Sequence, residues 1–271
     1  MVVSEMITID NLSCSIKQTV IFDQFNLIIS RGSFTTIAGP NSSGKSTLLR
    51  ILIGLEEYQG TIEIDDLVLS EAAKKSIRSK TGIVFENPDL NFVTETVEDE
   101  LLFPMENANY SRNVMKKRVD ELLDLFSLKE LKNCSIHQLS GGEKQLVAIA
   151  SALALEPTLL LLDEAFSMID GISKEKCLRI LKKLNKEKKL TIVQVTHDLE
   201  ESIYGTDLVL IKDGKLLASG KVMDLLTDEK LIKKSALESP FMVQLSQKLM
   251  YYDLIKEPIL DMNRMVNTLW K

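Results

Sequence analysis

The stretch from residue 39 to residue 47, Gly-Pro-Asn-Ser-Ser-Gly-Lys-Ser-Thr, constrains this chain more than any other. It matches the pattern G-x-x-x-x-G-K-[ST], with both glycines, the lysine and the serine at the fixed positions. The β-branched residues 33–38 before it predict a strand, and the apolar residues 48–53 after it predict the start of a helix. This context predicts a loop whose backbone N–H groups surround phosphate oxygens at a helix N-terminus, where the peptide dipoles favour negative charge.

Two side chains of this loop carry specific expectations. Lys45 is expected to reach the β- and γ-phosphates of a bound ATP, and the Ser46 hydroxyl is expected to ligate Mg²⁺. A glycine turn with a chance lysine is the alternative interpretation, and the motifs further along the chain argue against it. The residues expected to contact ATP are those of the whole loop: Gly39, Pro40, Asn41, Ser42, Ser43, Gly44, Lys45, Ser46 and Thr47.

Composition narrows the class of protein. A chain of 271 residues, 45% of them hydrophobic, is long enough for one large domain or for a domain with an appendage. The net charge of −6 argues against a surface that coats nucleic acid, because such a surface needs many cations to neutralise phosphates. The three cysteines Cys14, Cys134 and Cys177 are far apart and show no metal-ligand spacing, which indicates a reduced, cytoplasmic protein.

No segment has the pattern of a signal peptide or a membrane-spanning helix. The N-terminus lacks a basic stretch followed by an apolar one. The longest apolar candidate, residues 146–155, is about half the length of roughly 20 residues that a spanning helix needs. Any membrane role is therefore expected to come through a partner.

The order of the elements predicts an α/β fold. Residues 6–9 and 27–29 predict an initial antiparallel sheet, and the later alternation of buried strands with helices predicts a parallel core. Hairpin turns at Asp65-Asp66 and Asp213-Gly214 predict an added antiparallel layer. The expected core strands are 81–85, 158–162 and 190–196, and the expected helices are 97–131, 139–155 and 174–189, with Val114, Arg118, Leu122 and Leu125 on one face.

The buried strand at 158–162 runs directly into two acids, Asp163 and Glu164. Ligands of open α/β sheets bind at the carboxyl edge, so Asp163 is expected to hold Mg²⁺ and Glu164 to act as general base toward water. His197 follows another buried strand and is expected to contact the γ-phosphate or to orient the water. A strand end that is merely acidic and a structural histidine are the alternatives.

Residues 139–145, Leu-Ser-Gly-Gly-Glu-Lys-Gln, resemble the signature motif of ATP-binding cassette (ABC) ATPases. The other motifs of that family occur in order over about residues 3–234, including the Q-loop position Glu86 and a D-loop ending at Asp170. The resemblance implies a P-loop NTPase domain at 1–234 with an N-terminal antiparallel β-subdomain and a helical signature subdomain at about 90–155. A short C-terminal helical extension at 235–271 follows. The residues that the resemblance assigns to the nucleotide of a second subunit are Ser140, Gly141, Gly142 and Glu143, and it assigns Glu86 to Mg²⁺.

Within the ABC family the chain is similar to the ATPase (A) components of energy-coupling factor (ECF) importers. The similar segments are 85–89, 96–101, 105–107, 167–170 and 238–241. This resemblance implies an ATPase that powers uptake of vitamins or metal ions from the cytoplasmic face of the membrane. It implies a second ABC ATPase subunit, either a related chain or another copy, together with a transmembrane T component and a substrate-binding S component.

The chain departs from the family pattern at three positions. Glu86 stands where glutamine is usual and adds negative charge near the γ-phosphate, which predicts slower turnover. Ser42 replaces a usual glycine, which predicts backbone strain. Ile16 stands near the place of an aromatic residue that stacks on adenine, so it is expected to make only a weak contact, and Phe22 is a less favoured substitute.

These departures keep two other functions open. One is a nucleotide-binding, weakly hydrolysing half of an ATPase heterodimer, and the other is a soluble ABC ATPase without a transport role. The acids of 97–101 are either a solvated helix start or a contact for basic helices of a transmembrane subunit. The tail residues that share predicted helical faces either cover their own domain or contact the second ATPase: Phe241, Leu245, Leu249, Tyr252, Met262, Met265 or Val266, and Leu269.

Overall fold

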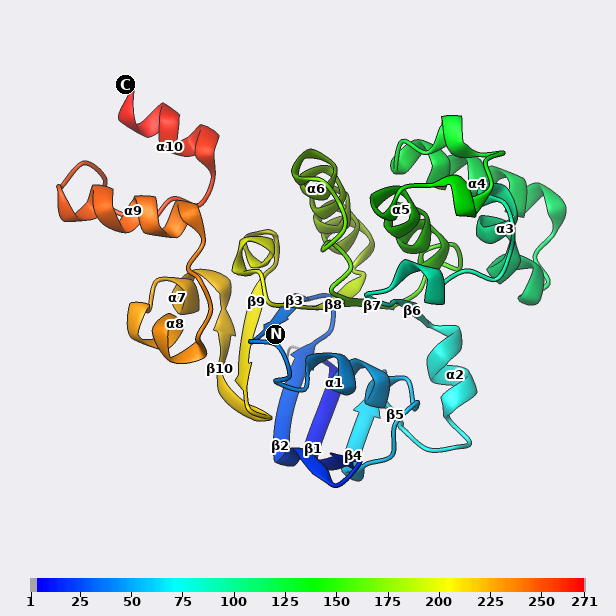
Figure 1. The fold of residues 1–271 in the computed structure, drawn as a ribbon, viewed down its shortest axis with the longest axis horizontal. Helices are drawn as coiled ribbons and strands as arrows, with labels where there is room; N and C mark the ends of the chain where they lie inside the picture. The colour runs from blue at the N-terminus through cyan, green and yellow to red at the C-terminus, as the bar shows by residue number, and fades with distance from the viewer. Residues whose placement is uncertain (1–3, 271) are drawn as a thin grey trace.

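The computed structural model of the chain describes residues 4–270 and contains two sheets (Figure 1). The first sheet is antiparallel, with the strand order β2-β1-β4-β5. Its strands are β1 (Glu5–Ile16), β2 (Thr19–Ser30), β4 (Gln59–Ile64) and β5 (Leu67–Val68). The predicted initial antiparallel sheet and the Asp65-Asp66 hairpin are both confirmed; both turn residues have positive φ, as a two-residue hairpin loop requires.

The second sheet has the order β10-β9-β3-β8-β7-β6, and only β10 runs antiparallel to its neighbour. Its strands are β3 (Phe34–Ala38), β6 (Thr81–Val84), β7 (Leu159–Asp163), β8 (Thr191–Thr196), β9 (Asp207–Lys212) and β10 (Lys215–Lys221). Every residue of β3, β7 and β8 is buried, as expected for parallel strands covered on both faces. The carboxyl ends of these three strands lie side by side and form the edge that carries the site.

The prediction for the second hairpin was only half right. Asp213 and Gly214 do turn the chain from β9 into β10, both with positive φ. The hairpin does not join the antiparallel layer, however, because β9 pairs in parallel with β3. It extends the edge of the central sheet instead.

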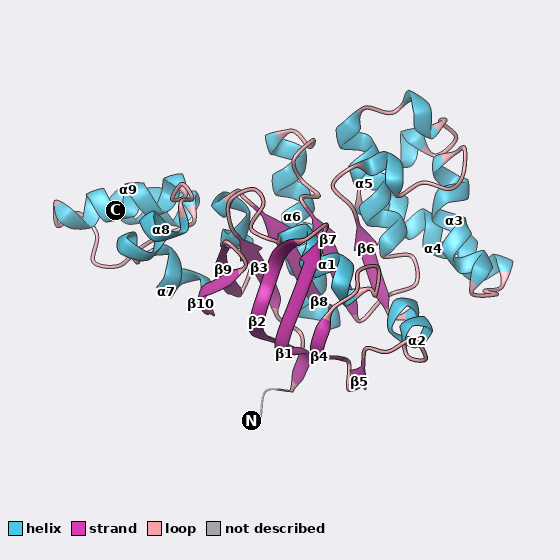
Figure 2. Cartoon of the chain, turned by 60° about the horizontal axis from the view of Figure 1, so that its bottom comes forward, coloured by secondary structure: helices cyan, strands magenta, loops and turns pink. Residues whose placement is uncertain are grey.

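Helices cover both faces of the central sheet (Figure 2). Helix α1 (Lys45–Leu52) lies between the two sheets, where its apolar face joins side chains of β1, β3 and β8 in one core cluster. Helix α6 (Gly171–Lys188) packs on the opposite face through Cys177, Leu178 and Leu181. The short helix α2 (Lys74–Ser79) precedes β6. The packing of α1 between the two sheets places its first residues beside the carboxyl ends of β7 and β8.

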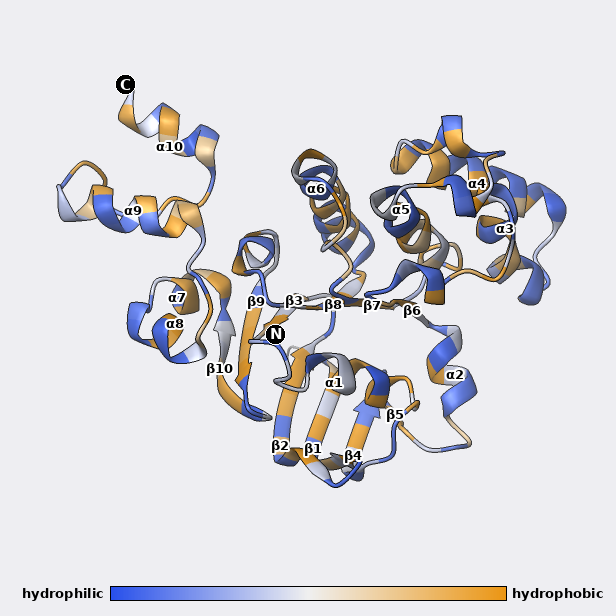
Figure 3. Cartoon of the chain, viewed as in Figure 1, coloured by the Kyte–Doolittle hydropathy of each residue, from blue (hydrophilic) through white to orange (hydrophobic). Residues whose placement is uncertain are grey.

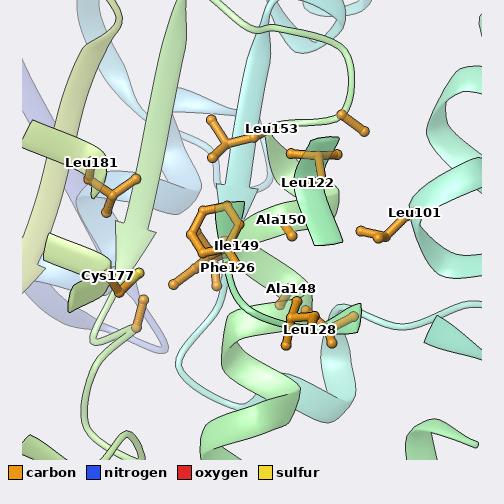
Figure 4. Close-up of a cluster of buried hydrophobic side chains, with 14 of the residues drawn as sticks. Leu101, Leu122, Phe126, Leu128, Ala148, Ile149, Ala150, Leu153, Cys177 and Leu181 are labelled. Atoms are coloured by element: carbon orange, nitrogen blue, oxygen red, sulfur yellow. The ribbon is translucent and has the colours of Figure 1, made fainter. Parts of the chain in front are cut away.

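Three helices stand beside α6 and share its core cluster (Figure 4): α3 (Val97–Asn107), α4 (Arg112–Leu125) and α5 (Gly141–Ala152). The expected face of α4 is correct at Leu122 and wrong at Val114, because the buried residues of the helix are Met115, Val119, Leu122 and Leu123. Val114 is 49% exposed. Arg118 lies at the flank of this face, where its guanidinium donates to the carbonyls of Leu153 and Ala154 at the end of α5.

The C-terminal segment forms α7 (Val222–Leu226), α8 (Glu229–Ser235), α9 (Phe241–Tyr251) and α10 (Met262–Leu269). Met242, Ile255, Ile259 and Met265 form a small core of their own between α9 and α10, and Figure 3 shows apolar and polar residues alternating along both helices. The predicted faces are correct in part, because Met265 is buried and Leu245, Leu249 and Leu269 pack against this core. They need correction at Phe241, Tyr252, Met262 and Val266, which are exposed. Of residues 4–270, no helix combines the length and apolar character that a membrane crossing requires.

Candidate nucleotide-binding site

Both fixed glycines of the phosphate loop are required sterically. A Cβ atom added at Gly39 would lie 2.3 Å from the carbonyl oxygen of Ile211. Gly44 has a φ of 98°, and a Cβ there would lie 2.7 Å from the Phe22 ring. Phe22 is buried beneath the loop in a tilted contact with Phe25, with the ring centroids 5.0 Å apart, and it cannot serve as the substitute adenine contact.

The Lys45 ammonium lies inside the curve of the loop. It donates to the carbonyl oxygens of Gly39 (2.8 Å) and Pro40 (3.1 Å), and it lies 3.7 Å from Oε1 of Glu164. Burial lowers the pKa of Lys45, an effect that the carboxylates of Glu164 and Asp163 oppose. A buried cation held only by carbonyls and a neighbouring carboxylate is well placed to exchange these partners for phosphate oxygens.

Asp163 is the last residue of β7, and it accepts a hydrogen bond of 2.7 Å from the Ser46 hydroxyl. Burial raises the pKa of Asp163, and the negative charge of Glu86 adds to this rise. The expected Mg²⁺ ligands Ser46 and Asp163 are thus in contact, and their oxygen atoms are the donors that this cation prefers.

Glu164 follows Asp163 and turns away from the strand with a φ of 45°. Its Oε2 lies 3.0 Å from Nδ1 of His197, which comes directly after β8. The parallel pairing of β7 with β8 brings these two residues together although 33 positions separate them in the sequence. Such a carboxylate–imidazole pair can hold a water molecule and accept its proton.

A cavity of about 350 Å³ brings the predicted residues together. Glu86 is exposed and lines it, together with Ser167 at the start of the D-loop. The hydroxyl of Ser43 is buried without a partner among the described residues, so the loop retains a free donor. The residues lining the cavity are Asn41, Ser42, Gly44, Lys45, Ser46, Thr47, Glu86, Glu164, Ser167 and His197.

The signature residues do not line this cavity. Ser140 and Glu143 form a capping box at the start of α5: the Ser140 hydroxyl donates to Glu143 Oε2 (2.7 Å) and accepts from the Glu143 N–H (3.3 Å). The backbone of Gly142 approaches the D-loop so closely that a Cβ would lie 3.1 Å from the carbonyl oxygen of Met168. Asp170, at the end of that loop, caps α6 by accepting hydrogen bonds of 3.1 Å from the backbone of residues 172 and 173.

Two of the departures have structural consequences. Ser42 has a φ of 64°, in the left-handed region where a side chain is strained, as the sequence predicted. Ile16 is partly buried at the end of β1 and does not line the cavity.

A second cavity, of about 400 Å³, lies at the opposite edge of the sheet near Leu122 and Thr191, and none of the predicted site residues lines it.

Sequence reasoning missed the residues that hold the Q-loop. Gln145 donates to the carbonyl oxygens of Glu86 (2.8 Å) and Phe85 (3.3 Å) although it lies on α5. Asn91 accepts from the Phe85 N–H at 3.0 Å. A glutamine within an otherwise apolar helix was the available signal, because a buried amide needs polar partners.

Comparison with known proteins identifies the family of this chain. A family model described as ABC transporter matches residues 22–167, which include the phosphate loop, the signature and the Asp163-Glu164 pair. The chain belongs to the ABC transporter family, among the ATP-binding proteins of energy-coupling factor transporters. Two of its relatives illustrate this membership. The energy-coupling factor transporter ATP-binding protein EcfA1 of Mycoplasmopsis pulmonis is 39% identical over 84% of this chain and 86% of its own. That of Oenococcus oeni is 38% identical over 98% of both.

Solved structures of ABC proteins have the same fold. The cbiO1 protein of Clostridium perfringens, described as part of the ABC transporter complex cbiONQ, superposes with a TM-score of 0.77 at 28% identity, covering 90% of this chain and 99% of its own. An ATP-binding cassette solved as a dimer bound to ADP and Pi has a TM-score of 0.74 at 32% identity, covering 80% of this chain and 99% of its own. The predicted ABC ATPase fold, with its antiparallel subdomain, helical subdomain and C-terminal helices, is confirmed.

Proposed function

We propose that this chain is the ATP-hydrolysing subunit that powers an ECF-type importer of vitamins or metal ions. One observation carries the proposal: side chains from three separate segments line one cavity, namely Lys45, Ser46, Glu164 and His197. Asp163 accepts a hydrogen bond from Ser46 beside them. The names of the full-length relatives support the transport role.

The residues divide the chemistry among them. The loop amides and Lys45 hold the phosphates. Ser46, Asp163 and Glu86 would supply oxygens for Mg²⁺. Glu164 accepts the proton of the attacking water, and His197 holds that water in place. Mg²⁺, when bound, neutralises charge on the phosphate oxygens. No covalent intermediate with the protein is needed, because positioning and electrostatic stabilisation supply the catalysis.

A second ATPase subunit completes the site. Ser140, Gly141, Gly142 and Glu143 lie outside the cavity of their own chain, so we propose that they close over the nucleotide of the partner, which is either a related ATPase or another copy. The transmembrane T component and the substrate-binding S component are the remaining proposed partners. They would keep the chain at the cytoplasmic face of the membrane, with the acids at the start of α3 facing a basic helix of the T component.

We propose residues 1–234 as the ATP-binding domain and 235–271 as an extension. The separate apolar core of α9 and α10 supports this boundary. The adenine base would rest near Ile16 with little stacking, because an aliphatic side chain offers no aromatic face.

Purification of the tagged chain from membrane extract tests the proposal. We expect an ATPase, an integral membrane protein and a small substrate-binding membrane protein to co-purify, and the complex to hydrolyse Mg-ATP. A chain that co-purifies with no membrane protein would contradict the transport role. A complex that binds but does not hydrolyse ATP would support the weakly hydrolysing alternative, which the strained Ser42 and the acidic Glu86 favour.

A further inference from the structure

The side chain of Gln145 joins two parts of the chain, the Q-loop and the signature helix, that the proposed function assigns to different nucleotides. It lies in the first two turns of α5, directly behind the signature residues, and it is completely buried. Its amide nitrogen donates to the carbonyl oxygens of Glu86 and Phe85, at 2.8 Å and 3.3 Å. Figure 1 shows α5 next to the segment that leaves β6, where these two residues lie.

The orientation of this amide is set by its surroundings. Two carbonyl oxygens face the nitrogen, and a flipped amide would place oxygen against oxygen. The Gln145 oxygen is buried with no partner among the described residues. An unpaired buried oxygen is unfavourable, so an apolar side chain of similar size removes this penalty together with the two hydrogen bonds of the nitrogen.

A second link lies beside the first. Lys144 donates to Asp89 at 2.7 Å, and its side chain is only 15% exposed. Asn91 holds the backbone of Phe85 from the other side. The rest of α5 is embedded in the helical core through Ala148, Ile149 and Ala150 (Figure 4). The segment 85–91 is therefore attached to the signature helix and not only to the strand that precedes it.

We propose that Gln145 is a positioning residue that holds Glu86 at the cavity and joins its position to that of the signature helix. The inference rests on the proposed function. Glu86 lines the cavity of its own chain, whereas the start of α5 is directed to the nucleotide of the partner. Because Gln145 binds the backbone of Glu86, movement of Glu86 toward Mg²⁺ pulls α5, and movement of α5 displaces Glu86.

The expected effect is on turnover and not on ATP affinity. The phosphate loop supplies most contacts to ATP, and Gln145 touches none of its residues. Without the amide, the backbone of Glu86 is no longer held at the cavity. A small displacement of a reacting or metal-binding group is enough to slow a reaction that depends on precise positioning. The Phe85 carbonyl keeps a second donor in Asn91, and Glu86 is exposed to water, so the fold should not lose stability.

The test uses Gln145→Met in the complex purified from membranes. We expect kcat for ATP to fall about tenfold with KM and thermal stability unchanged. The matched control is Gln194→Met, which removes another buried glutamine whose oxygen is also unpaired and which contacts Thr36 instead of the Q-loop. This control should leave kcat within about twofold of wild type.

A double-variant cycle separates positioning from a general structural role. In a Glu86→Ala background, Gln145→Met should have no further effect, whereas in a Glu86→Gln background it should still lower kcat. An equal fall in both backgrounds, or no fall in wild type, would overturn the inference. Hydrogen exchange of residues 85–91 should also quicken in Gln145→Met while that of α1 does not, and unchanged exchange there would overturn it too. A wild-type complex without ATPase activity would instead remove the proposed function on which the inference rests.

Discussion

Nδ1 of His197 lies 3.0 Å from Oε2 of Glu164. The two residues follow neighbouring parallel strands, and both line the cavity next to Lys45. Glu164 Oε1 lies 3.7 Å from the Lys45 ammonium, so the carboxylate stands between a cation and an imidazole. In the proposed function this arrangement would provide a base beside the bound phosphates while a neighbouring side chain limits its orientation.

Replacing Glu164 with glutamine should remove hydrolysis and keep binding. Glutamine preserves the shape of the side chain but cannot accept the proton of water, so we expect kcat of the complex to fall at least about a hundredfold. The affinity for Mg-ATP, measured by fluorescent-nucleotide displacement, should change by less than about threefold. Hydrolysis at the wild-type rate would show that Glu164 is not the general base.

His197 and Glu164 should behave as a unit. The double variant Glu164→Gln/His197→Ala is expected to hydrolyse ATP no more slowly than Glu164→Gln alone, because the histidine acts only on water that the carboxylate activates. Single-turnover rates of the four forms measure this coupling. Additive losses in the double variant would assign His197 a separate contact with the phosphate.

Neutralising Glu86 should speed turnover. Burial raises the pKa of Asp163, and the negative charge of Glu86, which lines the cavity, raises it further. Removing its charge by Glu86→Gln should raise kcat about threefold. Because the proposed Mg²⁺ site then loses a carboxylate, the Mg²⁺ concentration that gives the half-maximal rate should rise. The control is Glu106→Gln at the exposed end of α3, which should leave both quantities unchanged. A slower Glu86→Gln complex would contradict the reasoning.

Replacing Ser42 with glycine should stabilise the protein slightly. The left-handed φ of 64° costs a serine roughly 1–2 kcal/mol, of which the extra freedom of glycine in the unfolded chain cancels a part. We expect the melting temperature to rise by about 1–2 °C. Ser43→Gly is the matched comparison, because Ser43 is outside the left-handed region, and it should lower the melting temperature. If both variants have the same melting temperature, the backbone strain at Ser42 does not affect stability.

Glu201 should make stability depend on pH. Burial raises the pKa of Glu201 from its usual 4.5 to about 7, aided by Asp198 and opposed by Lys174, which donates to it at 3.2 Å. Between pH 4.5 and 7 the folded protein binds more protons at this group than the unfolded chain, so its contribution to stability is present below that window and is lost as the pH rises through 7.

The Glu201→Gln variant should therefore gain melting temperature relative to wild type as the pH rises from about 5 to 8. The exposed Glu187→Gln variant should follow wild type over the same range. A constant difference between Glu201→Gln and wild type would contradict the shifted pKa.

Most of the central fold could be predicted because local patterns and burial agree there. The unbroken apolar run that leads into Asp163 and the β-branched residues of β3 and β8 favour a sheet covered on both faces, and all three strands are confirmed. The amphipathic helices were harder. In α4 the prediction placed Val114 in the buried face where Met115 is found, because several faces of a short helix contain enough apolar residues and only packing in the shared core selects one. The same ambiguity explains why the predicted faces of α9 and α10 are only partly correct: Leu245, Leu249 and Met265 pack inward, whereas Phe241, Tyr252 and Met262 are exposed.

By itself the sequence determined the phosphate loop, the acidic end of β7 and the histidine after β8, because each depends on residues adjacent in the chain and on backbone rules that hold in any fold. Only the tertiary structure decided that Gln145 holds the backbone of Glu86, that Phe22 supports Gly44 from below, and that the second hairpin extends the central sheet. Those contacts join residues far apart in the sequence, and their existence depends on which helices and strands pack together, which no local pattern specifies.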